Sequence, residues 1–240
     1  MTSGRWLPHG SAQRPQVMAH RGASKAEREN TLVAFATARA MGSHAVELDV
    51  RRCGSGELVV HHNPVLEDST PLNAVDLDDL PSHVPTLEAS LDACAGMWVN
   101  VEVKNDPTEV DFDESESITL DTVELLRRRG EPTQWLVSSF RRETIDTVAR
   151  VWSALPTAFL VVEMGDPEAL ARDLVASGHQ ALHPWVKTLT REVVDTMHAH
   201  GLAVNTWTCD DPEKMVELIG WGIDGICTNV PDVALRVAGL

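Results

Sequence analysis

Short runs of apolar and β-branched residues alternate with longer helical stretches along this chain of 240 residues. Such alternation is typical of parallel strands joined by crossover helices. A parallel crossover needs about a dozen residues or more, and only the connection between residues 50 and 58 is too short for one. We therefore expect the run at 58–62 to pair antiparallel with the run before it, while the other eight runs form a TIM (β/α)8 barrel. The nine strand candidates are 17–21, 45–50, 58–62, 98–104, 135–140, 157–163, 181–185, 203–208 and 225–228.

Helix-forming stretches fill the connections between these strands. The first begins near Asn30 or Thr31, either of which can cap it, and Gly42 ends it. The segment 64–85 contains four prolines and several acidic residues, so we expect an irregular loop that crosses the mouth of the barrel. The predicted helices lie at 30–41, 86–95, 114–129, 141–152, 166–177, 190–200, 211–221 and from Pro231 onward.

Composition and charge exclude several classes of partner. The formal net charge of -16 argues against nucleic acid or an anionic membrane surface as the main partner. The apolar runs are shorter than a membrane span, so we expect no stable membrane insertion. The four cysteines show no zinc or disulfide spacing, which favours buried thiols in a cytoplasmic protein. We expect residues 1–15 to form a loosely ordered lead-in and residues 16–240 a single domain.

Residues 45–63 bring acidic and histidine side chains together on the predicted hairpin. With the turn at 54–56, counting outward along the two strands places His62 beside Glu47 and Asp49. The two carboxylates alternate around one residue, so both lie on the same face of their strand. Carboxylates side by side repel each other and are costly to bury unless a positive charge lies between them. The alternative is an edge strand whose acidic face meets water.

Chemically active side chains gather where the first predicted strands end, and the active site of a TIM barrel lies at this end of its strands. Three carboxylates on adjacent strands form an all-oxygen site suited to Mg²⁺ or Ca²⁺, and such an ion relieves their repulsion. Two histidines beside the ion can act as general base and general acid. An arginine and a lysine can bind a phosphate, so the set indicates phosphoester chemistry. The residues are His20, Arg21, Glu47, Asp49, His62, Glu102 and Lys104.

A series of short motifs extends over residues 17–232. In order they are AHRGAS at 19–24, ENT at 29–31, VELDV at 46–50, LVVHH at 58–62, VEVK at 101–104, SSF at 138–140, NTWT at 205–208 and DGICTN at 224–229. As a set they resemble the glycerophosphodiester phosphodiesterases, since HRG in register with ELD and HH is far more specific than any one motif. The resemblance implies a divalent-metal-dependent TIM barrel that cleaves a glycerophosphodiester into sn-glycerol 3-phosphate and an alcohol.

The resemblance also implies a role for each matching residue. The histidine and arginine of the HRG motif fall on His20, as a catalytic residue, and on Arg21, as a phosphate ligand. The second catalytic histidine of the family lies in a VV-x-HD pattern, which favours His62 over His61. Lys104 takes the place of the lysine near the phosphate. The implied ligands of one divalent cation, Mg²⁺ or Ca²⁺, are Glu47, Asp49 and Glu102.

Some positions depart from the family pattern or leave the role open. Asn63 stands where the family has aspartate, so we expect activity to be retained with an altered pH dependence. Arg28 replaces the usual proline before ENT, which we expect to change only the loop. Glu29 either supports the site residues from behind or is a carboxylate at the entry of a helix, and we expect the helix entry. Trp207 ends a predicted strand and either lines the glycerol or headgroup pocket or packs in the core.

Other functions are also compatible with parts of this pattern. A lysophospholipase D-like phosphodiesterase on lipid substrates would use the same residues but needs an apolar mouth, and the segment 64–85 offers only scattered leucine and valine. A non-catalytic phosphate-ester-binding barrel has support only from Asn63. A sugar-phosphate isomerase would need a Gly-rich phosphate loop after the seventh or eighth strand, which DGICTN does not supply.

Overall fold

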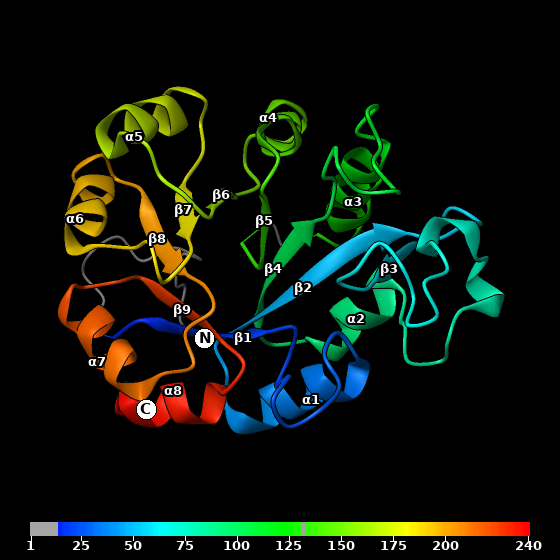
Figure 1. Cartoon of the computed structure of the whole chain (residues 1–240), viewed down its shortest axis with the longest axis horizontal. Coiled ribbons are helices and arrows are strands. Elements are labelled where there is room, and N and C mark those ends of the chain that lie inside the picture. Colours follow the sequence, from blue (N-terminus) through cyan, green and yellow to red (C-terminus); the bar gives the residue numbers. More distant parts are fainter. Residues whose placement is uncertain (1–13, 131–132) are drawn as a thin grey trace.

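A closed barrel of parallel strands forms the centre of the molecule. The computed structural model describes residues 14–130 and 133–240. Its barrel strands are β1 Gln16–His20, β2 Ala45–Arg52, β4 Trp98–Val103, β5 Trp135–Ser139, β6 Thr157–Val161, β7 Ala181–Pro184, β8 Ala203–Thr206 and β9 Gly225–Thr228. Each pairs in parallel with its neighbours, and β1 closes the ring by pairing with both β2 and β9. The predicted TIM barrel is therefore confirmed, with its helices outside the ring of strands (Figure 1).

The helices lie close to their predicted positions. Thr31 caps the first helix by accepting a hydrogen bond from the Ala34 N–H at 3.2 Å, and Gly42 ends it with a φ of 89°. Residues 1–13 of the predicted lead-in lie outside the described residues, and the division of the chain at residue 15 stays a prediction. The helices are α1 Leu32–Met41, α2 Leu87–Ala93, α3 Ser117–Arg129, α4 Arg142–Val151, α5 Pro167–Ala176, α6 Arg191–Ala199, α7 Pro212–Gly220 and α8 Pro231–Val237.

The extra strand, β3 Leu58–Val60, pairs antiparallel with β2 outside the barrel, as the short connection predicts. Val50 lies opposite Val60. The His61 N–H then donates to the Asp49 carbonyl at 3.0 Å, which brings the end of the hairpin back toward the barrel mouth. The hairpin therefore delivers His62 to the end of β2 that carries Glu47 and Asp49.

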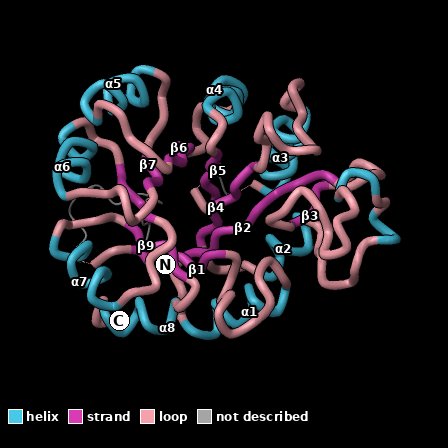
Figure 2. Tube along the Cα trace, viewed as in Figure 1, coloured by secondary structure: helices cyan, strands magenta, loops and turns pink. Residues whose placement is uncertain are grey.

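The predicted path of the segment 64–85 across the barrel mouth is wrong. This segment folds to one side of the barrel beside β3, with short 3-10 turns at Leu72–Ala74 and Leu77–Asp79 (Figures 1 and 2). Its apolar side chains, Leu72 and Val84 among them, pack with Cys53 and Val59 in a small core of their own. The burial of these side chains against the hairpin explains why the segment leaves the mouth open.

The two faces of the barrel strands have different compositions. Outward-facing valines and leucines of β2 and β4 pack beneath the helices in the main apolar core. Inward-facing residues near the strand starts are mostly small: Ala45, Ala158, Ala181 and Ala203 meet Met18 and Cys227 inside the barrel. Because these residues close the barrel from below, the polar inward positions farther along the strands lie around the open end. All four cysteines are buried and free of disulfide bonds, as predicted.

No helix among the described residues is both long enough and apolar enough to cross a membrane.

Candidate active site

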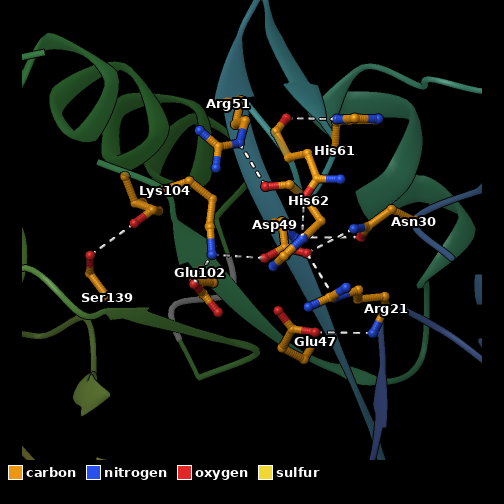
Figure 3. A network of polar contacts seen from close by, with 12 residues as sticks. Arg21, Asn30, Glu47, Asp49, Arg51, His61, His62, Glu102, Lys104 and Ser139 are labelled. Atoms are coloured by element: carbon orange, nitrogen blue, oxygen red, sulfur yellow. Dashed lines mark hydrogen bonds and ion pairs between the residues drawn. The ribbon is translucent and has the colours of Figure 1, made fainter. Parts of the chain in front are cut away.

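Three buried carboxylates meet at the open end of β2 and β4. Asp49 lies beside Glu102 in the strand register, and Glu47 lies one step deeper beside Asn100. Each carboxylate offers an oxygen, and these oxygens all lie within 4.8 Å of one another (Figure 3). The residues are only 3%, 1% and 8% exposed for Glu47, Asp49 and Glu102. The alternative of a solvated acidic edge is therefore wrong, because the acids face inward and water does not screen them.

Burial makes the ionisation of this cluster expensive. It raises the pKa of Glu47 well above its ordinary value, and the charges of Asp49 and Glu102 add to the effect. Burial also raises the pKa of Glu102, although Lys104 opposes the shift. For Asp49, burial is outweighed by the positive charges of Lys104 and Arg21, which lower its pKa to about 2. Lys104 and Arg21 thus stabilise the negative charge of Asp49. They do not supply enough positive charge to stabilise all three carboxylates.

Buried oxygens without a hydrogen-bond donor support the fit of the cluster to a divalent cation. Within the described chain, Glu47 Oε1 and Asp49 Oδ1 are buried without a hydrogen-bond donor, and so is the side-chain oxygen of Asn100. A buried oxygen with no donor costs free energy that a bound cation would recover. Hard cations such as Mg²⁺ and Ca²⁺ take such oxygen ligands. Glu47, Asp49 and Glu102 therefore have the chemistry and the proximity to hold one.

Arg21 and Lys104 approach the carboxylates from two sides. Arg21 has a positive φ of 58°, and its backbone N–H donates to Glu47 Oε2 at 3.0 Å while its Nε lies 3.2 Å from Asp49 Oδ2. Lys104 Nζ lies 2.8 Å from Glu102 Oε1 and 3.8 Å from Asp49 Oδ1. Both side chains line the cavity, so each can also meet an anion that enters it.

Glu29 has a different contact from the one predicted. Its carboxylate accepts two hydrogen bonds from Arg21 Nη1, at 3.1 and 3.0 Å, while Thr31 provides the cap of α1. Glu29 therefore orients the guanidinium of Arg21 rather than serving the helix.

The two candidate histidines are held alike, each through Nδ1 by an asparagine side chain. His20 Nδ1 lies 2.7 Å from Asn229 Oδ1, and His62 Nδ1 lies 2.9 Å from Asn63 Oδ1. Burial, helped by the charge of Arg21, lowers the pKa of His20. Burial lowers the pKa of His62 to about 4, although Asp49 opposes the shift. Both imidazoles are therefore neutral near pH 7, with Nε2 available to the cavity that they line.

Buried Arg51 fixes the backbone beside His62. Its side chain is fully buried, and its Nε donates to the His62 carbonyl at 2.8 Å. The rest of the guanidinium pairs with both oxygens of Asp111, at 2.8 and 2.7 Å, and of Glu109, at 3.0 and 2.8 Å. Neighbouring His61 instead contacts the Asn63 carbonyl at 2.8 Å and does not line the cavity.

A cavity of about 130 Å³ joins these groups. Of the predicted site residues, all but Asp49 line it. Trp207 forms part of the opposite wall: its ring meets Phe140 edge to face at 5.3 Å, and its Nε1–H donates to the His183 carbonyl at 2.8 Å. The predicted residues that line the cavity are His20, Arg21, Glu47, His62, Glu102, Lys104 and Trp207.

Sequence reasoning missed several polar residues in this cavity. His183 Nε2 lies 2.9 Å from Asn205 Nδ2, and both side chains are buried inside the barrel. A Cβ at Gly225 would lie 2.4 Å from Asn205 Oδ1, so only glycine leaves room for this amide. The alternation within each strand could have revealed these residues, because Asn100 shares a face with Glu102 and Asn205 shares one with Trp207.

The sequence of this chain matches those of known proteins over most of its length. A model of the Glycerophosphoryl diester phosphodiesterase family matches residues 20–233. The chain belongs to this family. The resemblance seen in its motifs is thus confirmed, and with it the assignment to a family of phosphoric diester hydrolases. A relative from Bacillus subtilis (strain 168), named glycerophosphodiester phosphodiesterase, is 28% identical over 257 residues, which cover 95% of this chain and 87% of the relative.

Solved structures of similar proteins share the same barrel. A putative glycerophosphoryl diester phosphodiesterase from Silicibacter pomeroyi has a TM-score of 0.85 at 24% identity, with 97% of each chain covered. A phosphodiesterase from Oleispira antarctica, in complex with the product sn-glycerol-3-phosphate, has a TM-score of 0.86 at 23% identity, covering 96% of this chain and 99% of that one. At these identities the likeness supports the fold.

Glu47 should make the stability of the metal-free protein depend on pH. Burial and the charges of Asp49 and Glu102 raise its folded-state pKa well above the ordinary value of 4.5, so above that pH the folded state binds more protons than the unfolded state. Stability from Glu47 is therefore present below about pH 4.5 and is lost as pH rises toward the folded pKa. The variant Glu47→Gln lacks this group. As pH rises, its free energy of unfolding should therefore increase relative to that of the wild type, by up to about 1.4 kcal/mol per pH unit. Urea unfolding at several pH values measures the difference, and a pH-independent difference would contradict the assignment.

Proposed function

We propose that this protein hydrolyses glycerophosphodiesters to sn-glycerol 3-phosphate and an alcohol with the help of one divalent cation, Mg²⁺ or Ca²⁺. The observation that carries the proposal is the meeting of two histidines, two basic residues and two buried carboxylates at one cavity, with the third carboxylate, Asp49, beside them. The name of the Bacillus subtilis relative and the product bound in the Oleispira antarctica structure support the substrate class. Four buried thiols support a cytoplasmic location, since reducing compartments keep thiols unpaired.

Each residue has a role that its surroundings support. Glu47, Asp49 and Glu102 would hold the cation, which when bound supplies Lewis-acid stabilisation of charge on the phosphoryl oxygens. Arg21 and Lys104 add positive charge for the phosphate. These side chains already contact the carboxylates, so they are oriented before substrate enters.

The two histidines divide the proton transfers. One accepts a proton from the nucleophile, which is water or the neighbouring glycerol hydroxyl. The other enters the reaction with a proton on Nε2 and passes it to the leaving alkoxide. Contacts through Nδ1 hold both rings and leave Nε2 of His20 and of His62 for these transfers. Trp207 and Phe140 would line the space for the glycerol or the headgroup.

A lysophospholipase D-like reaction on lipid substrates is a second candidate. Phe140, 38% exposed, and Val162, 44% exposed, follow β5 and β6 at the barrel mouth and could meet an acyl chain. The segment 64–85 lies to one side and adds no apolar cover over the mouth. Comparing kcat/KM for glycerophosphocholine and lysophosphatidylcholine tests the choice. We expect the soluble diester to be preferred, and preference for the lysolipid would favour the second candidate.

The variant Asn63→Asp should raise the pKa of His62, which burial holds at about 4. A carboxylate that accepts the Nδ1–H bond stabilises the imidazolium, so the expected shift is upward by about one unit or more. The limb of the kcat/KM profile set by His62 should therefore move to higher pH. The control Asn73→Asp adds the same charge at an exposed position of the segment 64–85. A profile that Asn63→Asp leaves unchanged would contradict the role of His62.

A further inference from the structure

A chain of hydrogen bonds connects the imidazole of His20 to the carboxylate of Asp210. Asn229 Oδ1 lies 2.7 Å from His20 Nδ1, and Asn229 Nδ2 donates to Asp210 Oδ2 at 2.7 Å. Asp210 Oδ1 accepts two further hydrogen bonds, from the Asn229 backbone N–H at 2.8 Å and from Thr228 Oγ1 at 2.9 Å. Asp210 lies in the connection after β8, and Asn229 directly follows β9. Two neighbouring strand ends thus support His20, although Asn229 lies 209 residues from it along the chain.

Asp210 fixes the direction of the hydrogen bonds that link it through Asn229 to His20. A carboxylate offers only acceptor atoms, so the NH₂ group of Asn229 must face Asp210 and its carbonyl oxygen must face His20. Ser24 Oγ donates to the same carbonyl oxygen at 2.9 Å. Rotating the amide by half a turn would place its oxygen against the carboxylate and lose both contacts. His20 must therefore carry its proton on Nδ1, which leaves the lone pair of Nε2 for the cavity.

His62 lacks this constraint. Asn63 Oδ1 lies 2.9 Å from His62 Nδ1, but within residues 14–130 and 133–240 no hydrogen bond holds the NH₂ group of Asn63. Either orientation of that amide is open, and either tautomer of His62 with it. Of these two histidines, His20 therefore has a fixed tautomer and His62 does not.

We propose that Asp210 and Asn229 are positioning residues that lock His20 in the tautomer protonated on Nδ1. The inference rests on the proposed function and gives His20 the role of the base, whose Nε2 accepts the proton of the nucleophile. A molecule with the proton on Nε2 presents no lone pair to the cavity and cannot accept a proton there. The lock keeps that form from being populated.

Three variants separate the lock from general stability. Asp210→Asn removes the acceptor-only group, so the Asn229 amide can rotate. In a fraction of the molecules His20 should then adopt the other tautomer. The double variant D210N/N229D places a carboxylate directly against His20 Nδ1, which restores an acceptor-only partner and the original tautomer. Asp211→Asn makes the same charge change one residue away, where Asp211 Oδ1 caps α7 by accepting from Glu213 N–H at 3.0 Å, and asparagine caps equally well.

The tautomer of His20 can be read without substrate from the ¹⁵N shifts of its ring nitrogens, assigned with a His20→Ala sample. We expect a pyrrole-type Nδ1 and a pyridine-type Nε2 in the wild type, in D211N and in the double variant, and a mixture in D210N. For glycerophosphocholine, kcat should fall about tenfold in D210N with KM unchanged, a part of the 10²–10⁴ that proton transfer by a side chain contributes, and recover in the double variant.

An unchanged tautomer in D210N would overturn the lock, and so would a mixed tautomer with undiminished kcat. If the wild type hydrolyses no glycerophosphodiester, the proposed function fails, while the ¹⁵N shifts still decide whether Asp210 fixes the tautomer. Loss of activity in the double variant despite a restored tautomer would also contradict the proposal, since the tautomer would then not explain the rate.

Discussion

Replacing His20 or His62 with alanine should lower kcat on glycerophosphodiesters by about 10²–10⁴-fold, the range typical of a side chain that transfers a proton in the transition state. Both imidazoles line the cavity beside the carboxylates, and each is held through Nδ1 so that Nε2 can reach a bound substrate. Steady-state kinetics on each variant measures the loss. The double variant His20→Ala/His62→Ala should lose little more than the worse single variant, because residues that act as a unit are not additive.

His61→Ala is the matched control for this prediction. His61 neighbours His62 in sequence, but its imidazole contacts the Asn63 carbonyl and lies outside the cavity wall. Its kcat should stay within about threefold of the wild type, which corresponds to about 0.7 kcal/mol or less in activation free energy. Near-normal activity in His20→Ala or His62→Ala, with the thermal transition unchanged, would contradict the proposed chemistry. A large loss in His61→Ala would instead place the second histidine one residue earlier in the hairpin.

Replacing Glu47 with glutamine should weaken binding of Mg²⁺ or Ca²⁺ by about 100-fold or more, since even the loss of a group that supports a metal ligand costs 10–100-fold. Glu47 is 3% exposed and has a buried oxygen with no hydrogen-bond donor in the described chain, so a cation is the partner that its surroundings fit. Calorimetric titration of metal-stripped protein measures the affinity directly. The shift in melting temperature on adding metal gives a second readout that needs no substrate.

Glu67→Gln is the control for this change. Glu67 carries the same charge but its side chain is 80% exposed, and it pairs with Arg28 outside the carboxylate cluster. It should bind metal like the wild type. Metal affinity that survives in Glu47→Gln would contradict the assignment of the carboxylates as ligands. Equal loss in both variants would show that the effect follows net charge rather than the buried site.

Strand periodicity and connection length were enough to predict the barrel and most of the cavity. The short connection before β3 identified that strand as antiparallel, and the alternation around Leu48 placed Glu47 and Asp49 on one face. His62 followed from the register of the hairpin. These features depend on local geometry with a fixed period, which the sequence specifies directly.

The remaining parts of the site depend on contacts between distant segments. Asn229 meets His20 across the closure of the barrel, and Arg51 pairs with Glu109 and Asp111 from a later loop. No local pattern predicts which acid a buried arginine will find. The path of the segment 64–85 does not follow from its sequence for a related reason: its scattered apolar residues have no clear period, yet they suffice to pack on the hairpin beside Val59.

Hydrolysis of glycerophosphocholine by metal-stripped protein, with Mg²⁺ or Ca²⁺ added back and sn-glycerol 3-phosphate assayed enzymatically, tests the proposed reaction most directly. We predict no release of sn-glycerol 3-phosphate before metal is restored and rapid release after it, because the buried carboxylates, the phosphate-facing cations and the two histidines form one site. Release that continues undiminished without metal would contradict the role of the carboxylates. No release with either ion, from folded protein that binds metal, would contradict the proposed substrate class.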